Sequence, residues 1–370
     1  MKFTCEKNAL VSAISVASRT VAQKSTIPAL EGIYIRAGVK LTLSGYNLET
    51  GITISVDAEI QQTGACIMPS RLFFDIIRKL PGDTVSISVD EKFKVSIRGG
   101  ISSFSITAMS SEDYPELPEV ESDKGISLPQ NELKAMIGGT SFAVSENQAR
   151  PIHTGCLFEV EDSSITVVAV DGYRLALRRW KSEEPIGRTL KFVVPAAALK
   201  EAEKILGDTD EDCTFFLGSK HILFTIGEAT LVCRLLEGEF LDWRRVLPQN
   251  QPVKLAVNVA KMTDSIERVG LIISEKLKSP VRCKFGENTA DFRSVSTIGE
   301  AHDVCQIAGD GQDMEIGFNC RYLLDALRAI PDAECSLELI NGLSPIVMNP
   351  CDGSERYSYM VLPVRLKAGE

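Results

Sequence analysis

A four-part pattern of residues recurs three times along this chain and constrains the fold more than any other feature of the sequence. Each copy begins with a short strand-like segment that enters an amphipathic helix, starting at Phe3, Ile126 and Leu255. A strand-like region with turn residues follows, then a strand that enters a second helix, and then more strands. The repeat unit is about 123 residues long, which is enough for each unit to form its own hydrophobic core. The pattern therefore predicts three similar domains rather than a stack of short repeats.

The second helix of each copy gives the sharpest evidence for this repeat. We expect these helices at 69–80, 195–206 and 319–330, each ended by Gly, Pro or Asp residues. Their starts and their ends are both separated by 126 and then 124 residues. Paired spacing of this kind indicates a duplicated unit.

Acidic, proline-bearing stretches at 110–125 and 237–252 separate the copies. The sequence thus predicts three domains, at 1–122, 123–249 and 250–370. Each has the outline β–α–ββ–β–α–ββ, which is typical of an α+β fold with two helices packed on one side of antiparallel strands.

Composition excludes several classes of protein. No uncharged apolar run approaches the ~18 residues of a membrane span, and the first ten residues lack a signal-peptide core, so we expect a cytoplasmic protein. The ten cysteines form no CxxC motif, which indicates reduced thiols rather than a disulfide framework or a zinc site. With three histidines and no nucleotide-binding motif, we predict no catalytic residues, no metal and no cofactor.

Charge is unevenly distributed. The whole chain carries a formal −10, which argues against nucleic-acid binding by bulk charge. The six expected helices with their trailing loops instead carry a net charge of about +6, so the rest of the chain is strongly acidic. Solvated helix faces often collect Lys and Arg, and this ordinary explanation stands beside a DNA-facing one.

The number of helices suggests how such a surface could be used. Helices packed roughly 8–10 Å apart leave a central hole of about 9 Å when six close a circle and about 28 Å when twelve do. A duplex with grooves about 8 Å deep is about 20 Å across. Two chains in head-to-tail contact could therefore surround DNA, whereas one could not.

Six segments carry a resemblance to a known family: LTLSGYNLET (41–50), RLFFDIIRKLPG (71–82), VDGYRLAL (170–177), FLDWRRVLP (240–248), EIGFNCRYLLDAL (315–327) and YMVLPVRL (359–366). Through them the chain resembles the bacterial DNA polymerase III beta subunits, the sliding clamps, over essentially its full length. The resemblance implies a non-enzymatic homodimeric ring with the DNA clamp fold. Such a ring encircles duplex DNA without sequence preference and tethers the replicative polymerase.

The resemblance also implies a groove between the second and third domains. It would bind short linear motifs of polymerases, the clamp loader and repair proteins. Its expected residues are His153, Val170, Gly172, Tyr173, Arg174, Leu175, Leu241, Arg245, Val246, Met360, Val361, Leu362, Pro363, Val364, Arg365 and Leu366. Apolar side chains near a few fixed cations suit an extended peptide with aliphatic anchors. Taken alone, DGYRL is equally typical of a hairpin end, and VLPVRL of a final edge strand.

This sequence departs from the family at three places. His153 lies where relatives often have an aliphatic residue, and Leu241 replaces a frequent proline. A tail, Lys367 to Glu370, extends beyond the residue at which many relatives stop. These departures bear on the shape of the groove and its peptide preference.

The remaining expected contacts are with DNA and with a second copy of the chain. DNA-binding candidates are Lys24, Arg71, Arg78, Lys79, Asn147, Gln148, Arg150, Lys200 and Lys204, each of which is otherwise a solvated surface residue. At the dimer contact, Phe104 would meet Ile272 and Ile273 of the next chain, although all three could be intradomain core.

Two rival functions remain open at this point. A hydrolase or transferase could use Asp171, Tyr173 and Arg174, but the sequence offers no plausible pair of nucleophile and base. A monomeric scaffold that binds peptides but not DNA agrees with the net charge of −10 and with the groove.

Overall fold

The computed structural model describes residues 1–121, 124–273 and 279–366. Two expectations lie outside the described residues: the first domain boundary, at 122/123, and the tail from 367 to 370. The described chain forms two compact units, one of Met1–Lys134 with Ala197–Leu235 and one of Ala135–Ala196 with Leu236–Glu370. The middle copy of the repeat is shared between the units.

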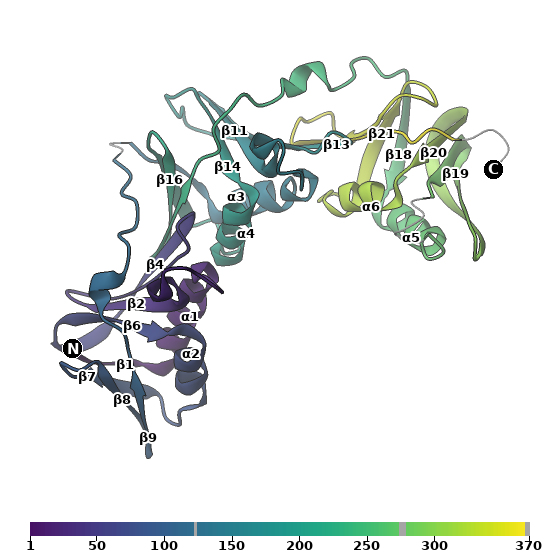
Figure 1. Ribbon diagram of the computed structural model, residues 1–370. Coiled ribbons are helices and arrows are strands. Elements are labelled where there is room, and N and C mark those ends of the chain that lie inside the picture. The colour runs from purple at the N-terminus through teal and green to yellow at the C-terminus, as the bar shows by residue number, and fades with distance from the viewer. Residues whose placement is uncertain (122–123, 274–278, 367–370) are drawn as a thin grey trace. The chain divides into compact units, whose positions relative to one another are not determined.

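Each copy contains two α-helices and antiparallel strands, which confirms the predicted α+β class (Figure 1). The helices are α1 (Lys7–Ala17), α2 (Ser70–Lys79), α3 (Gln130–Gly138), α4 (Ala196–Ile205), α5 (Val259–Gly270) and α6 (Cys320–Arg328). Short 3-10 turns connect the other elements: η1 (Ser18–Thr20), η2 (Pro28–Glu31), η3 (Ser111–Asp113), η4 (Ser141–Ala143), η5 (Pro151–Thr154) and η6 (Trp243–Arg245). Among the described residues, no helix has both the length and the apolar character that a membrane span requires.

The first unit holds two antiparallel sheets. The five-stranded sheet has the order β5 (Ala58–Gln62), β1 (Lys2–Glu6), β7 (Thr84–Val89), β8 (Lys94–Gly99) and β9 (Ser102–Thr107). The eight-stranded sheet has the order β10 (Ile126–Pro129), β15 (Asp212–Leu217), β16 (His221–Ile226), β17 (Ala229–Arg234), β4 (Thr50–Val56), β3 (Leu41–Tyr46), β2 (Gly32–Ala37) and β6 (Gly64–Pro69). Strand β17 of the middle copy pairs with β4 of the first, so one sheet joins two copies.

The second unit holds a single ten-stranded sheet. Its order is β14 (Leu190–Pro195), β11 (Gly155–Glu161), β12 (Ser164–Val170), β13 (Arg174–Lys181), β23 (Tyr357–Val361), β22 (Ile346–Pro350), β21 (Glu334–Leu339), β18 (Val253–Asn258), β20 (Gly299–Phe318) and β19 (Val281–Ser296). Here β13 of the middle copy pairs with β23, the last strand of the third copy.

Corresponding helices bury corresponding residues. Phe73 on α2, Leu199 on α4 and Leu323 on α6 are each fully buried, and they are separated by the predicted 126 and 124 residues. Asn319 begins α6 by accepting a hydrogen bond from the Tyr322 amide at 3.2 Å, as expected of an N-cap. In the first unit α1 lies beside α2, and in the second α5 lies beside α6 (Figure 1).

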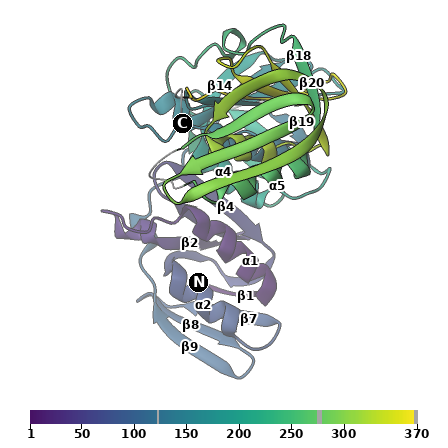
Figure 2. The same cartoon turned by 90° about the vertical axis from the view of Figure 1, so that its right-hand side faces the viewer.

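The predicted strand outline is wrong in number. The three copies have five, four and two strands between their helices where three were expected, and three after the second helix where two were expected. The extra strands arise where few residues separate one strand from the next; a single residue, Asp57, separates β4 of the eight-stranded sheet from β5 of the five-stranded sheet. In the third copy two expected strands are one: β20 runs for 20 residues beside β19, as Figure 2 shows.

A substitution in the repeated core tests this packing. Phe73→Ala removes a fully buried ring from the hydrophobic core of the first unit, so we expect the free energy of unfolding to fall by about 3–5 kcal/mol. Urea unfolding followed by circular dichroism measures it. The matched control is Leu72→Ala, because Leu72 is the adjacent residue on α2 and is 49% exposed. Similar losses from both variants would contradict the assigned helix face.

Candidate functional site

Two segments expected in the groove, 170–175 and 359–364, lie side by side at the junction of β13 and β23. Leu175 pairs with Met360, and Arg174 pairs with Val361. The pairing continues past the strands, because the Leu362 amide donates to the Tyr173 carbonyl at 2.8 Å. The Val364 amide donates to Gly317 at the same distance. We call this junction of β13 and β23 the seam.

One face of the seam is apolar. Val170, Leu175 and Met360 are buried there in a cluster that also contains Leu157, Val168, Leu177, Val193, Phe240, Trp243 and Val347. Leu362 packs against this cluster and is half-buried. Of the expected groove residues beside it, Leu241, Val246 and Val364 keep 36–42% of their surface exposed. The seam therefore has a floor of buried apolar residues and a rim of exposed apolar residues.

The segment that supplies Leu241 and Val246 is anchored by Trp243. The Trp243 indole N–H donates to Glu159 at 3.1 Å, and Arg244 donates to the same carboxylate at 2.8 Å. The Arg244 guanidinium also lies 4.2 Å from the centre of the indole ring. Burial acts to raise the pKa of Glu159, but these hydrogen bonds outweigh it and lower that pKa. Glu159 thus stays ionised and holds the rim in place.

Arg174 does not present a charge on the apolar face. It is buried on the other side of the strand, where it donates to Asp325 and to the Phe142 carbonyl, both at 2.6 Å. It also donates to Asp171 at 2.9 Å and lies 4.4 Å from the ring centre of Tyr322. Its charge is neutralised internally, so Arg174 positions the seam. The exposed cations of the predicted set are Arg245 and Arg365, and Arg245 pairs with Asp242 at 3.1 Å.

The turn before β13 places Tyr173 at the surface. The Asp171 carboxylate accepts from the amides of Tyr173 and Arg174 at 2.8 and 3.0 Å. Gly172 between them has φ +93, a conformation that favours glycine. Tyr173 is 61% exposed and stacks on Tyr322 with ring centres 6.0 Å apart. An aromatic pair, with Tyr173 exposed and Tyr322 half-buried, therefore borders the seam.

His153 lies beside the apolar cluster. Its ring meets Phe240 edge to face, with centres 5.0 Å apart, and its Nδ1 is buried without a hydrogen-bond partner among the described residues. Burial, together with the nearby Arg150 charge, lowers the pKa of His153. The His153 ring therefore packs against Phe240 at the edge of the apolar cluster.

The expected DNA-binding cations are all exposed. In the first unit Lys24, Arg71, Lys79 and Lys200 have no ion-pair partner within the described ranges. Arg78 pairs with Asp75 at 3.3 Å and Lys204 with Glu201 at 2.7 Å. Exposed pairs of this kind are worth little, so they leave both cations available to phosphates.

The remaining DNA-binding candidates lie in the second unit, on the loop before η5. Gln148 and Arg150 are exposed. The Asn147 side chain instead accepts from the Ala149 amide at 2.9 Å and shapes the loop.

The residues expected at the dimer contact lie at two ends of the sheets. Phe104 lies on β9, an edge strand of the five-stranded sheet, and is 42% exposed. Ile272 and Ile273 follow α5 and are half-buried, and α5 packs against β19, the edge strand of the ten-stranded sheet. Unpaired edge strands are ready to pair with another chain.

The sequence reasoning missed the partners that hold the seam together. Phe240 and Trp243 form part of its floor, Val347 extends it, and Tyr322 and Asp325 fix Arg174. Trp243 could have been found, because it lies within the motif 240–248. Asp325 lies within the motif 315–327, but its bond to Arg174 could not have been found there, because only the fold brings α6 to β13.

No catalytic or metal centre is evident in the described part of the chain. In the turn of Asp171, Tyr173 and Arg174, the Asp171 carboxylate already accepts hydrogen bonds from the amides of Tyr173 and Arg174 and from the Arg174 guanidinium. Within residues 1–121, 124–273 and 279–366, no three His, Cys, Asp or Glu side chains gather as a metal site requires.

Comparison with known proteins gives full-length matches. Three family profiles match in order: DNA polymerase III beta subunit, N-terminal domain at 1–118, central domain at 127–242 and C-terminal domain at 244–365. The chain is 32% identical to the beta sliding clamp of Staphylococcus epidermidis, over 99% of both chains. It is similar in structure to the DNA polymerase sliding clamp from Bacillus subtilis, with TM-score 0.94, 30% identity and coverage of 99% and 100%. The DNA polymerase III subunit beta from Pseudomonas aeruginosa gives TM-score 0.92 and 28% identity, with the same coverage.

The environment of His153 predicts its titration. Because burial and Arg150 disfavour the imidazolium, we expect an NMR titration of the ring Cε1–H resonance to give a pKa below the ordinary 6.5. A lowered histidine pKa means that the unfolded chain binds the proton more tightly. Its contribution to stability is therefore full above 6.5 and falls as the pH drops below that value. The variant His153→Gln assigns the resonance, and a midpoint at or above 6.5 would contradict this description.

Proposed function

Because this chain belongs to the DNA polymerase III beta subunit family, the sliding clamps, we propose that two copies close head to tail into a ring around duplex DNA. The ring tethers the replicative polymerase in the cytoplasm. The observation that carries this proposal is the match of all three domain profiles, in order, along a chain with the same fold.

Ring closure would use the free ends of the sheets. The edge strand β9 with Phe104 belongs to the first copy of the repeat, and β19 with Ile272 and Ile273 belongs to the third. A contact between unlike ends is heterologous, and two such contacts can close a ring of two chains. An exposed phenylalanine on an edge strand supports this arrangement.

DNA would be bound through its phosphates, without recognition of its base sequence. The exposed cations on α2 and α4 and after η1 suit phosphates. Contacts to phosphates carry no sequence information by themselves, so the ring would be free to move along the duplex. Affinity for DNA can stay low, because release would require the ring to open.

The seam would bind the ring's partners. An extended segment with aliphatic side chains can lie against Leu362, Leu241 and Val246 and bury apolar surface there. Partners would include the replicative polymerase, other polymerases, the clamp loader and repair proteins. Tethering converts rebinding of the polymerase to DNA into an intramolecular event and so raises its effective concentration.

We propose that this role needs no chemistry from the chain. Burial raises the pKa of the Cys66 and Cys213 thiols to about 12, so neither is poised as a nucleophile. The charged cluster at Arg174 is occupied by internal hydrogen bonds.

The central test compares two forms of one plasmid. After loading by the clamp loader with ATP, gel filtration at moderate salt should show the protein retained on nicked circular DNA and lost from linear DNA. A restriction cut made after loading is the matched control, because it opens an end without changing sequence or charge. Equal retention on both forms would overturn encirclement.

Substitution at the edge strand tests ring closure. Phe104→Asp would place a charge in the apolar contact, and we expect the dissociation constant of the dimer to rise roughly 30-fold or more, by analogy with hot-spot residues. Analytical ultracentrifugation measures it. Ser103→Asp is the control, since Ser103 is exposed on the same strand and its side chain points to the other face. A wild-type protein that stays monomeric at all concentrations would favour the scaffold without DNA encirclement.

A further inference from the structure

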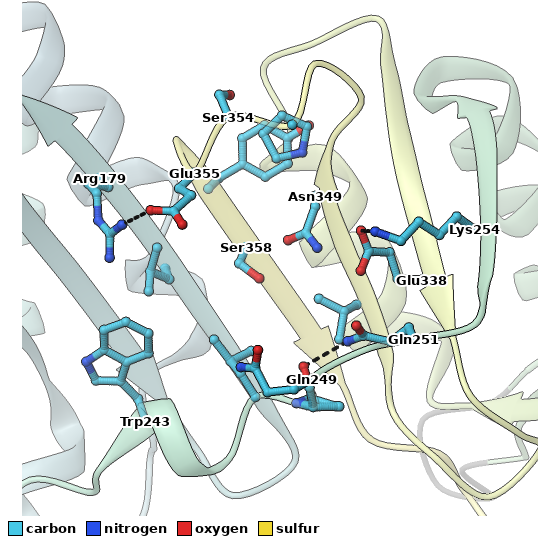
Figure 3. A pocket seen from close by; sticks show the side chains of 17 residues that line it. Arg179, Trp243, Gln249, Gln251, Lys254, Glu338, Asn349, Ser354, Glu355 and Ser358 are labelled. Atoms are coloured by element: carbon cyan, nitrogen blue, oxygen red, sulfur yellow. Dashed lines mark hydrogen bonds and ion pairs between the residues drawn. The ribbon is translucent and has the colours of Figure 1, made fainter.

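A hollow of about 390 Å³ lies on the face of the ten-stranded sheet that carries the apolar cluster (Figure 3). Its size is typical of sites that bind small molecules or side chains. Leu177, Val347 and Trp243 belong both to this hollow and to the cluster beneath the seam. We call it the flank pocket, because it continues the seam along β13.

Strand register explains this continuity. Leu175 and Leu177 point to the same face of β13, and they pair with Met360 and Ser358 on β23. Arg179, two residues farther on, lines the flank pocket. From Leu175 to Arg179 is four residues of strand, roughly 13 Å, which an extended peptide of about four residues covers.

The charges of the flank pocket cancel. Arg179 is paired with Glu355, and Lys254 with Glu338 at 3.1 Å. Figure 3 shows these two pairs on opposite sides of the hollow. Each cation has a carboxylate partner and the four charges sum to zero, so the flank pocket offers no net attraction to a charged group and suits an uncharged ligand.

Several uncharged polar groups converge on the hollow. The amides of Gln249 and Asn349 and the hydroxyl of Ser358 line it, and none of the three has a hydrogen-bond partner among the residues described. Gln251 differs, because it donates to the Pro248 carbonyl at 2.9 Å. All three groups are exposed or half-buried, so they can bond to water or to a ligand. A mostly apolar hollow with a few polar groups directed into it is the usual pattern of a recognition site.

We propose that the flank pocket binds the residues that flank the aliphatic anchors of a partner peptide, and that it selects uncharged hydrogen-bonding side chains such as Asn, Gln, Ser, Thr or Tyr. This inference rests on the proposed peptide binding at the seam. The occupant is a peptide because the hollow continues a surface suited to an extended chain and lies about four residues from it. The flank pocket adds specificity, since only a side chain with hydrogen-bonding groups can bond to its polar residues.

The test uses random twelve-residue peptides displayed on phage and selected on the full-length protein. Parallel selections use Val246→Glu, which places a charge on the seam rim, and Gln249→Trp, which fills the flank pocket from its exposed edge. Gln62→Trp is the matched control, an exposed glutamine at the end of β5. The best peptide and a version truncated to its aliphatic anchors are then compared by fluorescence anisotropy.

We expect selected peptides to share an aliphatic anchor pair with an uncharged polar residue about three to five positions away. Truncation should weaken binding to the wild type about tenfold. Gln249→Trp should weaken the full peptide to the same level and leave the truncated one unchanged. Asn349→Ala, which removes one polar group without filling space, should cost about threefold for the full peptide only.

The outcomes separate the two proposals. Equal binding of the full and truncated peptides to the wild type would overturn the flank pocket while leaving the seam intact. Equal binding of the full peptide to wild type and to both pocket variants would do the same. Peptides that bind Val246→Glu as well as wild type, or no enriched peptide at all, would count against peptide binding at the seam and therefore against both proposals.

Discussion

Pairing between edge strands of different repeat copies is the interaction on which the rest of this structure depends. Strand β17 pairs with β4 in the first unit, and β13 pairs with β23 in the second. Unpaired strand edges leave backbone N–H and C=O groups without partners, and each pairing removes two such edges. The middle copy thereby loses its independence, because its strands belong to two different sheets. Only β5, β9, β10, β6, β14 and β19 remain as sheet edges among the described strands.

The seam shows how one such pairing creates a binding surface. Alternation along β13 sends Leu175 to the apolar face and Arg174 to the opposite one. On the opposite face Arg174 joins Asp171 to Asp325, which ties β13 to α6 of another repeat copy. A buried charge with several hydrogen bonds loses much when one partner is removed, so this cluster fixes the register of the junction. The geometry of the apolar rim and of the flank pocket therefore depends on that register.

Helix positions could be predicted well because they depend on local signals. The spacing of Phe73, Leu199 and Leu323 was fixed by the repeat, and all three are buried. Strand numbers were predicted poorly, because breaks as short as the single residue Asp57 between β4 and β5 leave little trace in a sequence. Candidate site residues divide in the same way: Leu175 and Met360 lie together in the buried floor of the seam, whereas the Arg174 charge is turned to the opposite face. Whether the exposed cations contact DNA stays a prediction.

The sequence by itself determined the threefold repeat, the α+β class, the helix cores and the family, because each follows from the periodicity of apolar residues or from short motifs. Tertiary structure alone decided which strands pair across copies, which face each seam residue occupies and which polar side chains line the flank pocket. The physical reason is distance along the chain. Arg174 and Asp325 are 151 residues apart, and nothing local to either residue encodes a bond of 2.6 Å between them. Such contacts form only when complete sheets bring their edges together.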